Sequence, residues 1–271
     1  MIGGCGAVDQ RGESFLEERL ATYAPNQPWS ESLHREFWDQ YRWYLLIGGM
    51  PEVVAAFVAG GKEQRIRNIH DNIVAGYADD LPKYARQSDV PRLREVFRRL
   101  PMFVGKKIKF SEILPDTKTA DVRRCVDLLV MAGIVTRVTH SHCAGLPVRA
   151  GMNEKVFKTY WLDCGMLNRM RGLTWGVWAD GQTKILYEGP LAEQFVAQEM
   201  LAAQHSSDPE PLCYWLREGK QGNAEVDFVI TMNQQIIPIE VKSGKSGRLK
   251  SLQQLMWQKH LRKALRFDLN P

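Results

Sequence analysis

Two short apolar segments near the end of the sequence, each containing a carboxylate, constrain the fold most strongly. Residues 224–231 read AEVDFVIT and residues 236–242 read IIPIEVK. Both are rich in β-branched and aromatic residues, which favour β-strands. A carboxylate is rarely buried in a strand unless it is paired or binds a cation. The pattern therefore predicts two strands that carry a charged site.

Side chains on a strand point to the same face at every second residue. Glu240 and Lys242 should therefore emerge together, and Asp227 can lie beside them as a cross-strand neighbour. Glu193, on a predicted helix before these strands, completes the candidate catalytic set. Glu225 is predicted to point to the opposite face of its strand and to be solvated.

Converging carboxylates repel each other unless a cation lies between them. Asp227 and Glu240 are therefore the candidate ligands of a metal ion, and oxygen ligands of this kind suit Mg²⁺ or Mn²⁺. Such an ion lowers the pKa of a bound water and stabilises charge on a phosphate. Lys242 could position that water. The alternative is an inactive site, in which the acids only pair with Lys242 and neighbouring basic groups.

The hydrophobic periodicity predicts an α+β/α/β multidomain chain. Its blocks are an N-terminal helical segment at residues 1–87, a winged helix at 88–151, a bridging segment at 152–180 and a last domain at 181–271. Within the last domain the elements follow the order αβββαβ. They are predicted at 190–203, 212–217, 224–231, 236–242, 249–261 and 264–269.

The winged helix is predicted from three helices followed by a hairpin. The helices are expected at 91–100, 111–114 and 120–132, and the hairpin strands at 134–139 and 146–149. A separate strand, 156–161, is expected in the bridging segment. Acidic and basic residues alternate on the exposed face of helix 120–132, so a role in DNA binding and a role in protein contacts both stay open.

Composition narrows the cellular environment and the binding partners that we expect for the protein. Five cysteines are scattered without a CxxC pair, which favours a reducing, cytoplasmic environment. No uninterrupted apolar stretch is long enough for a membrane span. The net charge is +5, and residues 241–266 contain basic but no acidic residues. That run is either a phosphate-binding surface or a solvated helix face, and Trp257 within it is expected to pack in the core.

The segments EVDFVI and PIEVKSG, after a helix that carries a glutamate, resemble the core of the PD-(D/E)xK nuclease superfamily, which has a restriction-endonuclease-like fold. The order GGMPEVV, winged helix, YWLDCGML, EGPLAEQFVAQEM, YWLREG, AEVDFVI and IPIEVKSG resembles the domain of unknown function 4143 family, found in the C-terminal half of many AAA-type ATPases. The likeness covers about residues 35–271. It implies that Asp227 and Glu240 are metal ligands, Lys242 is the catalytic lysine and Glu193 is the helix acid.

Two functions follow as hypotheses. The first is a Mg²⁺-dependent phosphodiesterase, a nuclease that processes DNA. The second is a non-catalytic DNA- or protein-binding module of an ATPase assembly. The triplet Gly244-Lys245-Ser246 lacks the remaining glycine frame of a P-loop, so no ATP site and no ATPase activity are expected from this chain alone. We therefore expect the C-terminal portion of an ATPase-family protein, whose partner is an ATPase domain or subunit.

Overall fold

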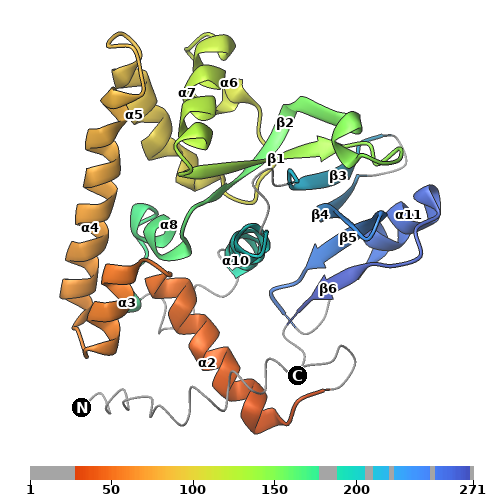
Figure 1. The fold of residues 1–271 in the computed structure, drawn as a ribbon, viewed down its shortest axis with the longest axis horizontal. Coiled ribbons are helices and arrows are strands. Elements are labelled where there is room, and N and C mark those ends of the chain that lie inside the picture. The colour runs from red at the N-terminus through yellow and green to blue at the C-terminus, as the bar shows by residue number, and fades with distance from the viewer. Residues whose placement is uncertain (1–27, 177–187, 205–209, 220–222, 245–247, 269–271) are drawn as a thin grey trace.

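Figure 1 shows the computed structural model, which describes residues 28–176, 188–204, 210–219, 223–244 and 248–268. Three parts of the predictions lie outside the described residues. They are residues 1–27 of the predicted N-terminal segment, residues 177–180 of the predicted bridging segment, and Lys245 and Ser246 of the glycine-lysine-serine triplet. Among the described helices, none is long and apolar enough to cross a membrane.

The N-terminal segment folds into helices, as its periodicity predicts. They are α2 (Glu31–Ile47), α3 (Pro51–Val58) and α4 (Glu63–Asp80), followed by the short 3-10 turn η1 (Leu81–Lys83). Ser30 caps α2 by accepting the N–H of Leu33. Gly48 ends α2 with a φ of +74°, a conformation that glycine adopts at little cost.

Asp163 connects the end of α2 to the helix α8 (Cys164–Met170). Its carboxylate accepts the N–H of Gly49 at 2.6 Å and the N–H of Met166 at 2.7 Å. A Cβ atom on Gly48 would lie 2.2 Å from Asp163 Oδ1. Glycine at position 48 is therefore needed for this close approach as well as for its positive φ.

A three-helix block follows, which we define by its helices. They are α5 (Val90–Arg99), α6 (Phe110–Ile113) and α7 (Thr119–Met131), with the 3-10 turn η2 (Leu100–Phe103) after α5. Val122, Cys125, Val126 and Leu129 of α7 are all fully buried. They are the stripe expected from a 3.6-residue period, and the order of the three helices agrees with the sequence analysis.

The hairpin after α7 differs from the prediction in its second strand. The strand β1 (Val135–Ser141) pairs with β2 (Met152–Trp161), whereas residues 148–151 form the short 3-10 turn η3 (Val148–Gly151). The predicted strand at 146–149 is therefore wrong. The strand predicted at 156–161 belongs to β2, which pairs with β1 in its place. The longer pairing buries the aromatic residues Phe157, Tyr160 and Trp161 almost completely.

The last block supplies elements close to the predicted ranges. These are α10 (Glu188–Ala202), β3 (Cys213–Arg217), β4 (Ala224–Met232), β5 (Gln235–Val241), α11 (Lys250–Lys259) and β6 (Leu265–Phe267). The described strands form a single mixed sheet in the order β2-β1-β3-β4-β5-β6. β1 runs parallel to β3 through Thr139 and His140. One sheet thus joins strands from the predicted blocks 88–151, 152–180 and 181–271.

The helices α10 and α11 cover opposite faces of this sheet (Figure 1). Tyr214 packs in the core that contains Leu191 of α10, whereas its neighbour Trp215 packs with Leu255 of α11. Successive residues of a strand face opposite sides, so the sheet lies between two apolar layers. Glu193, one of the predicted site residues, lies on α10 itself.

Candidate functional site

Asp227 and Glu240 lie on neighbouring strands, at adjoining positions of an antiparallel pair. Phe228 of β4 pairs with Ile239 of β5, and the two carboxylates occupy the next position along each strand. The N–H of Val241 donates to Asp227 Oδ2 at 2.8 Å. This hydrogen bond ties the Asp227 carboxylate to β5 and keeps it beside Glu240.

The register of β4 against β3 shifts at the residue that carries this carboxylate. Between Cys213 and Trp215 the pairing changes, so Asp227 and Phe228 both lie opposite Tyr214. An additional residue of this kind bends a strand and redirects its side chains. The strict alternation of β4 is therefore interrupted where the site is built.

Lys158 of β2 lies among the acids, a residue that the sequence analysis did not select. Its Nζ is 3.1 Å from Glu193 Oε2, 2.6 Å from Glu225 Oε1 and 3.7 Å from Asp227 Oδ1. The same Nζ lies 5.6 Å from the centroid of the Tyr214 ring. The side chain is only 1% exposed. Burial alone would lower the pKa of Lys158, but the three carboxylates raise it above its ordinary value, so the amine stays charged.

Tyr160, two residues further along β2, contacts the same carboxylate as Lys158. Its hydroxyl donates to Glu193 Oε2 at 2.7 Å. Burial raises the pKa of Tyr160 well above its ordinary value, so the hydroxyl keeps its proton. Burial also raises the pKa of Glu193 to about 7, although Lys158 and Tyr160 oppose this change. The Glu193 carboxyl therefore changes protonation near neutral pH.

Gln194 fixes α10 against β2 and so positions Glu193. Its amide Nε2 donates to the carbonyl of Trp161 at 2.7 Å, and its Oε1 accepts the N–H of Trp161 at 2.8 Å. The side chain is fully buried. Two hydrogen bonds between one amide and one residue's backbone leave the helix little freedom to rotate, which holds Glu193 at Lys158.

Glu225 corrects the sequence analysis, which placed it on the opposite face and in solvent. It lies two residues before Asp227, and the period of a strand puts both carboxylates on the same side. Its side chain is 36% exposed and forms an ion pair with Lys158. Glu225 is therefore part of the cluster.

Glu240 is the most unusual member, because one of its oxygens has no partner among the described residues. Its side chain is 6% exposed. Oε1 contacts the ammonium group of Lys242, the first residue after β5, whereas the buried Oε2 accepts no hydrogen bond. Burial and the nearby charge of Asp227 raise the pKa of Glu240. A buried acceptor without a donor is costly, and a cation or a proton at this oxygen would remove that cost.

The cluster carries an excess of negative charge. Its four carboxylates face two ammonium groups, so the acids exceed the cations by two formal charges. We call this set the acidic centre. Its members are Glu193, Glu225, Asp227, Glu240, Lys158 and Lys242. Buried charges that are not balanced take up protons or bind counter-ions.

The donor set at Asp227 and Glu240 fits Mg²⁺ or Mn²⁺. Both ions prefer carboxylate oxygens, and Mg²⁺ usually binds through one or two carboxylates while it keeps several waters. Within the described ranges, no group of three or more His, Cys, Asp or Glu side chains is arranged to hold a metal. The chain can therefore supply two carboxylate ligands here, and water would complete the coordination.

A sequence signal for Lys158 did exist. It lies in the segment VFKTYW, in which a single lysine interrupts an apolar strand and shares a face with Tyr160. A lysine is almost never fully buried without an acidic partner. The signal indicated a partner without identifying it, because the acids lie 35 or more residues further along the chain.

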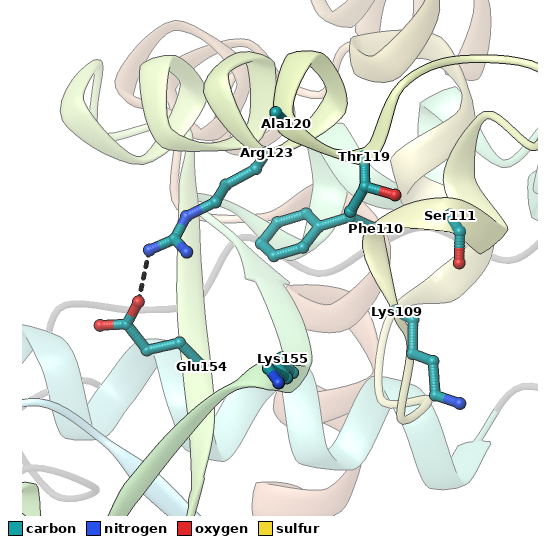
Figure 2. Close-up of a pocket in the computed structure, with 8 residues that line it drawn as sticks. All are labelled: Lys109, Phe110, Ser111, Thr119, Ala120, Arg123, Glu154 and Lys155. Atoms are coloured by element: carbon teal, nitrogen blue, oxygen red, sulfur yellow. Dashed lines mark hydrogen bonds and ion pairs between the residues drawn. The ribbon is translucent and has the colours of Figure 1, made fainter.

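A separate cavity of about 440 Å³ lies in the three-helix block (Figure 2). Arg123 of α7 forms an ion pair with Glu154 of β2 on one side of it, and the basic residues Lys109 and Lys155 also line it. Phe110, which is 5% exposed, supplies part of the apolar lining. None of the residues of the acidic centre lines this cavity.

Two family models match the chain. The first, described as Domain of unknown function (DUF8612), covers residues 39–176. The second, described as Domain of unknown function (DUF4143), covers residues 188–268 and confirms the resemblance for that segment. No curated protein and no solved structure matches the chain. Lys158 lies in the first segment, whereas the four acids of the acidic centre lie in the second.

Proposed function

The chain belongs to the DUF8612 family, a domain of unknown function, and from the geometry of its acidic centre we propose a cation-dependent phosphodiesterase site that acts on DNA. One observation carries the proposal. Glu240 holds a buried oxygen without a hydrogen-bond donor among the described residues, next to Asp227 on the adjacent strand. A divalent cation between the two carboxylates would supply a partner for this oxygen.

Each residue of the site has a defined task in this proposal. Asp227 and Glu240 would hold Mg²⁺ or Mn²⁺. When bound, the cation lowers the pKa of a water and stabilises negative charge on a phosphate. Lys242, whose ammonium group contacts Glu240 and whose side chain is 27% exposed, orients the water and the phosphate. Glu193, with a pKa of about 7, is placed to exchange a proton near neutral pH.

A run of basic residues in the last block supports a polyanionic substrate. The segment around α11 carries four exposed basic residues, which are Arg248, Lys250, Arg262 and Lys263. Phosphate backbones bind to such groups with release of counter-ions. The restriction-endonuclease-like interpretation of the last block and the winged-helix interpretation of the three-helix block agree with the same class of substrate.

The similarity to DUF4143 also supports a partner. The resemblance implies that segments of this family accompany AAA-type ATPases, so we propose that the chain works with an ATPase domain or subunit. We expect that ATP hydrolysis by the chain alone stays at background, and that added ATP leaves its cleavage of DNA unchanged.

A non-catalytic DNA- or protein-binding module is the second candidate, and Lys158 favours it. Its ammonium group already neutralises part of the charge of Glu193, Glu225 and Asp227. If the remaining acids take up protons, the centre needs no divalent ion. The acidic centre would then only hold α10 to the sheet.

A cleavage assay separates the two candidates. The full chain is incubated with Mg²⁺ or Mn²⁺ and with linear double-stranded or single-stranded DNA. We expect that Asp227→Asn and Lys242→Ala lower the cleavage rate by about 100-fold or more. Asp116→Asn and Lys118→Ala make the same chemical changes outside the acidic centre and should leave the rate unchanged.

The second candidate predicts a different set of results. The wild-type chain would not cleave either DNA and would bind no Mn²⁺ in calorimetry. Salt-sensitive affinity for DNA would then indicate a DNA-binding module. Absence of any DNA affinity would leave contacts with other proteins as its function.

A further inference from the structure

Lys158 is the most deeply buried charged side chain of the acidic centre. It is 1% exposed, and its neighbours Phe157 and Thr159 on β2 are fully buried. Removing an ammonium group from water costs several kcal/mol even after relaxation of the protein. A lysine is retained in such a place only where its charge is used.

One carboxylate would be enough to compensate Lys158, yet three lie within 4 Å. Nζ is 2.6 Å from Glu225, 3.1 Å from Glu193 and 3.7 Å from Asp227. These acids come from α10 and β4, whereas the lysine comes from β2. One ammonium group thus compensates carboxylates from two other elements, as a bound cation would.

We propose that Lys158 is a built-in cation: its ammonium group occupies a position in the acidic centre that would otherwise take a divalent ion. This inference deepens the proposed function, on which it rests for the ion at Asp227 and Glu240. Lys158 neutralises the part of the centre formed by Glu193 and Glu225. The wild-type chain consequently takes a single ion, at Asp227 and Glu240.

The arrangement makes Lys158 a positioning residue. It shares Asp227 with the proposed ion site, so it holds one oxygen of that carboxylate while the Val241 N–H holds the other. It also links the two matched segments, since its strand lies in residues 39–176 and its acids lie in residues 188–268. The last segment by itself lacks this charge.

The inference is tested by counting bound Mn²⁺ on the full chain, by electron paramagnetic resonance and by calorimetry. We expect the wild type to bind a single ion and Lys158→Ala to bind a second one, because truncation both removes the charge and opens room for the ion. Lys158→Arg keeps the charge and should bind a single ion. Lys155→Ala truncates an exposed lysine of the same strand, and this matched control should also bind a single ion.

The double variant Lys158→Ala/Glu193→Gln identifies where the added ion binds. It should lose the second ion and keep the first, because a neutral amide at position 193 does not provide a charged ligand. If the added ion persists with unchanged affinity in this variant, it binds elsewhere and the inference is wrong.

The failure of this inference differs from the failure of the proposed function. A folded Lys158→Ala chain that binds the same number of ions as the wild type overturns the role of Lys158, while the ion of the wild type still supports the proposed function. A wild type without any ion refutes the cation site at Asp227 and Glu240. In that case an ion gained by Lys158→Ala supports the built-in cation, and no gain overturns it.

Lys158→Ala can also fail to fold without metal. Circular dichroism then measures whether Mn²⁺ restores a cooperative unfolding transition. Restoration by Mn²⁺, but not by the same concentration of monovalent salt, supports the inference. A chain that stays unfolded with Mn²⁺ but folds when Glu193→Gln is added shows that only charge balance matters, which overturns it.

Discussion

The acidic centre and the surface of α7 both combine acidic and basic side chains, but they differ in charge balance and in burial. On α7 and its neighbours, four arginines form ion pairs with four acids; the members are Arg92, Arg123, Arg124 and Arg137 with Asp89, Asp121, Asp127 and Glu154. The charges are equal in number, and all members except Asp89 reach solvent. In the acidic centre the acids outnumber the cations and are mostly buried.

This difference in charge balance and burial distinguishes a structural surface from a candidate functional site. Balanced pairs on a surface are hydrated and screened, so each contributes little free energy and attracts no further ion. An uncompensated group of buried acids keeps a strong local field, because the low dielectric around it does not screen the charge. Our proposed function therefore uses the acidic centre, and we interpret the charges of α7 as structural. Four predictions test this contrast.

The largest effect is expected when the buried positive charge is removed. Lys158→Met keeps most of the side-chain volume and leaves three carboxylates without their cation. Breaking a buried ion pair by removing one partner costs about 3–5 kcal/mol. Urea denaturation in the presence of a chelator measures the free energy of unfolding. Lys155→Met on the same strand is the control, and an equal loss in both variants would contradict the role of burial.

The second effect is a dependence of stability on pH that comes from Glu193. Its pKa is raised from 4.5 to about 7, so the folded chain binds this proton more tightly than the unfolded chain. The resulting stabilisation is complete below pH 4.5 and is lost as the pH rises through about 7. We expect an effect on the order of 2 kcal/mol in denaturation without metal. Glu193→Gln should remove it, and an unchanged pH dependence in that variant would rule out Glu193 as its source.

The third prediction concerns the sign of a change in the free energy of unfolding. Glu240→Gln imitates the protonated acid, whose carboxylate form is disfavoured by burial and by Asp227. Without metal, we expect the free energy of unfolding to rise at alkaline pH, where the wild-type carboxyl would be ionised. The same variant should lose Mn²⁺ binding. Glu154→Gln makes the same substitution in a balanced exposed pair and should not stabilise the chain; stabilisation there would remove the contrast between the two regions.

The smallest effect is expected on the surface of α7. Arg123→Gln removes ion pairs with Asp127 and Glu154, whose side chains are 39% and 51% exposed. Exposed pairs of this kind contribute about 0–1 kcal/mol, so the midpoint of thermal unfolding should hardly move. The affinity for DNA should also stay unchanged, since this surface has no excess positive charge. A large loss of either would reassign α7 to the functional surface.

Much of the last block could be predicted because its signals are local. The alternation of residues in β4 and the nearly continuous β-branched run of β5 predict two strands, and the short connection between them favours an antiparallel pair. Asp227 and Glu240 then become neighbours through register alone. Glu225 follows from the same alternation, and its wrong assignment was an error in applying the period rather than a limit of the sequence.

Other features depend on contacts between distant segments. The second strand of the hairpin was predicted too early, because a short loop was favoured over the longer strand that buries Phe157 and Trp161. Trp257 was expected in the core, but it is 78% exposed. On α11 the buried positions are Leu252 and Leu255, and only packing against the sheet decides which face of a helix is covered.

The sequence by itself determined the order of elements, the apolar layers and the pair of carboxylates on adjacent strands, because these rest on periods of two and 3.6 residues within one stretch of chain. The tertiary structure alone decided that β1 runs beside β3 and that Lys158 reaches the acids. No periodicity specifies which distant strands become neighbours. That choice comes from burying Trp161 and Gln194 together with the rest of the core, and it brings the buried ammonium group to the acidic centre.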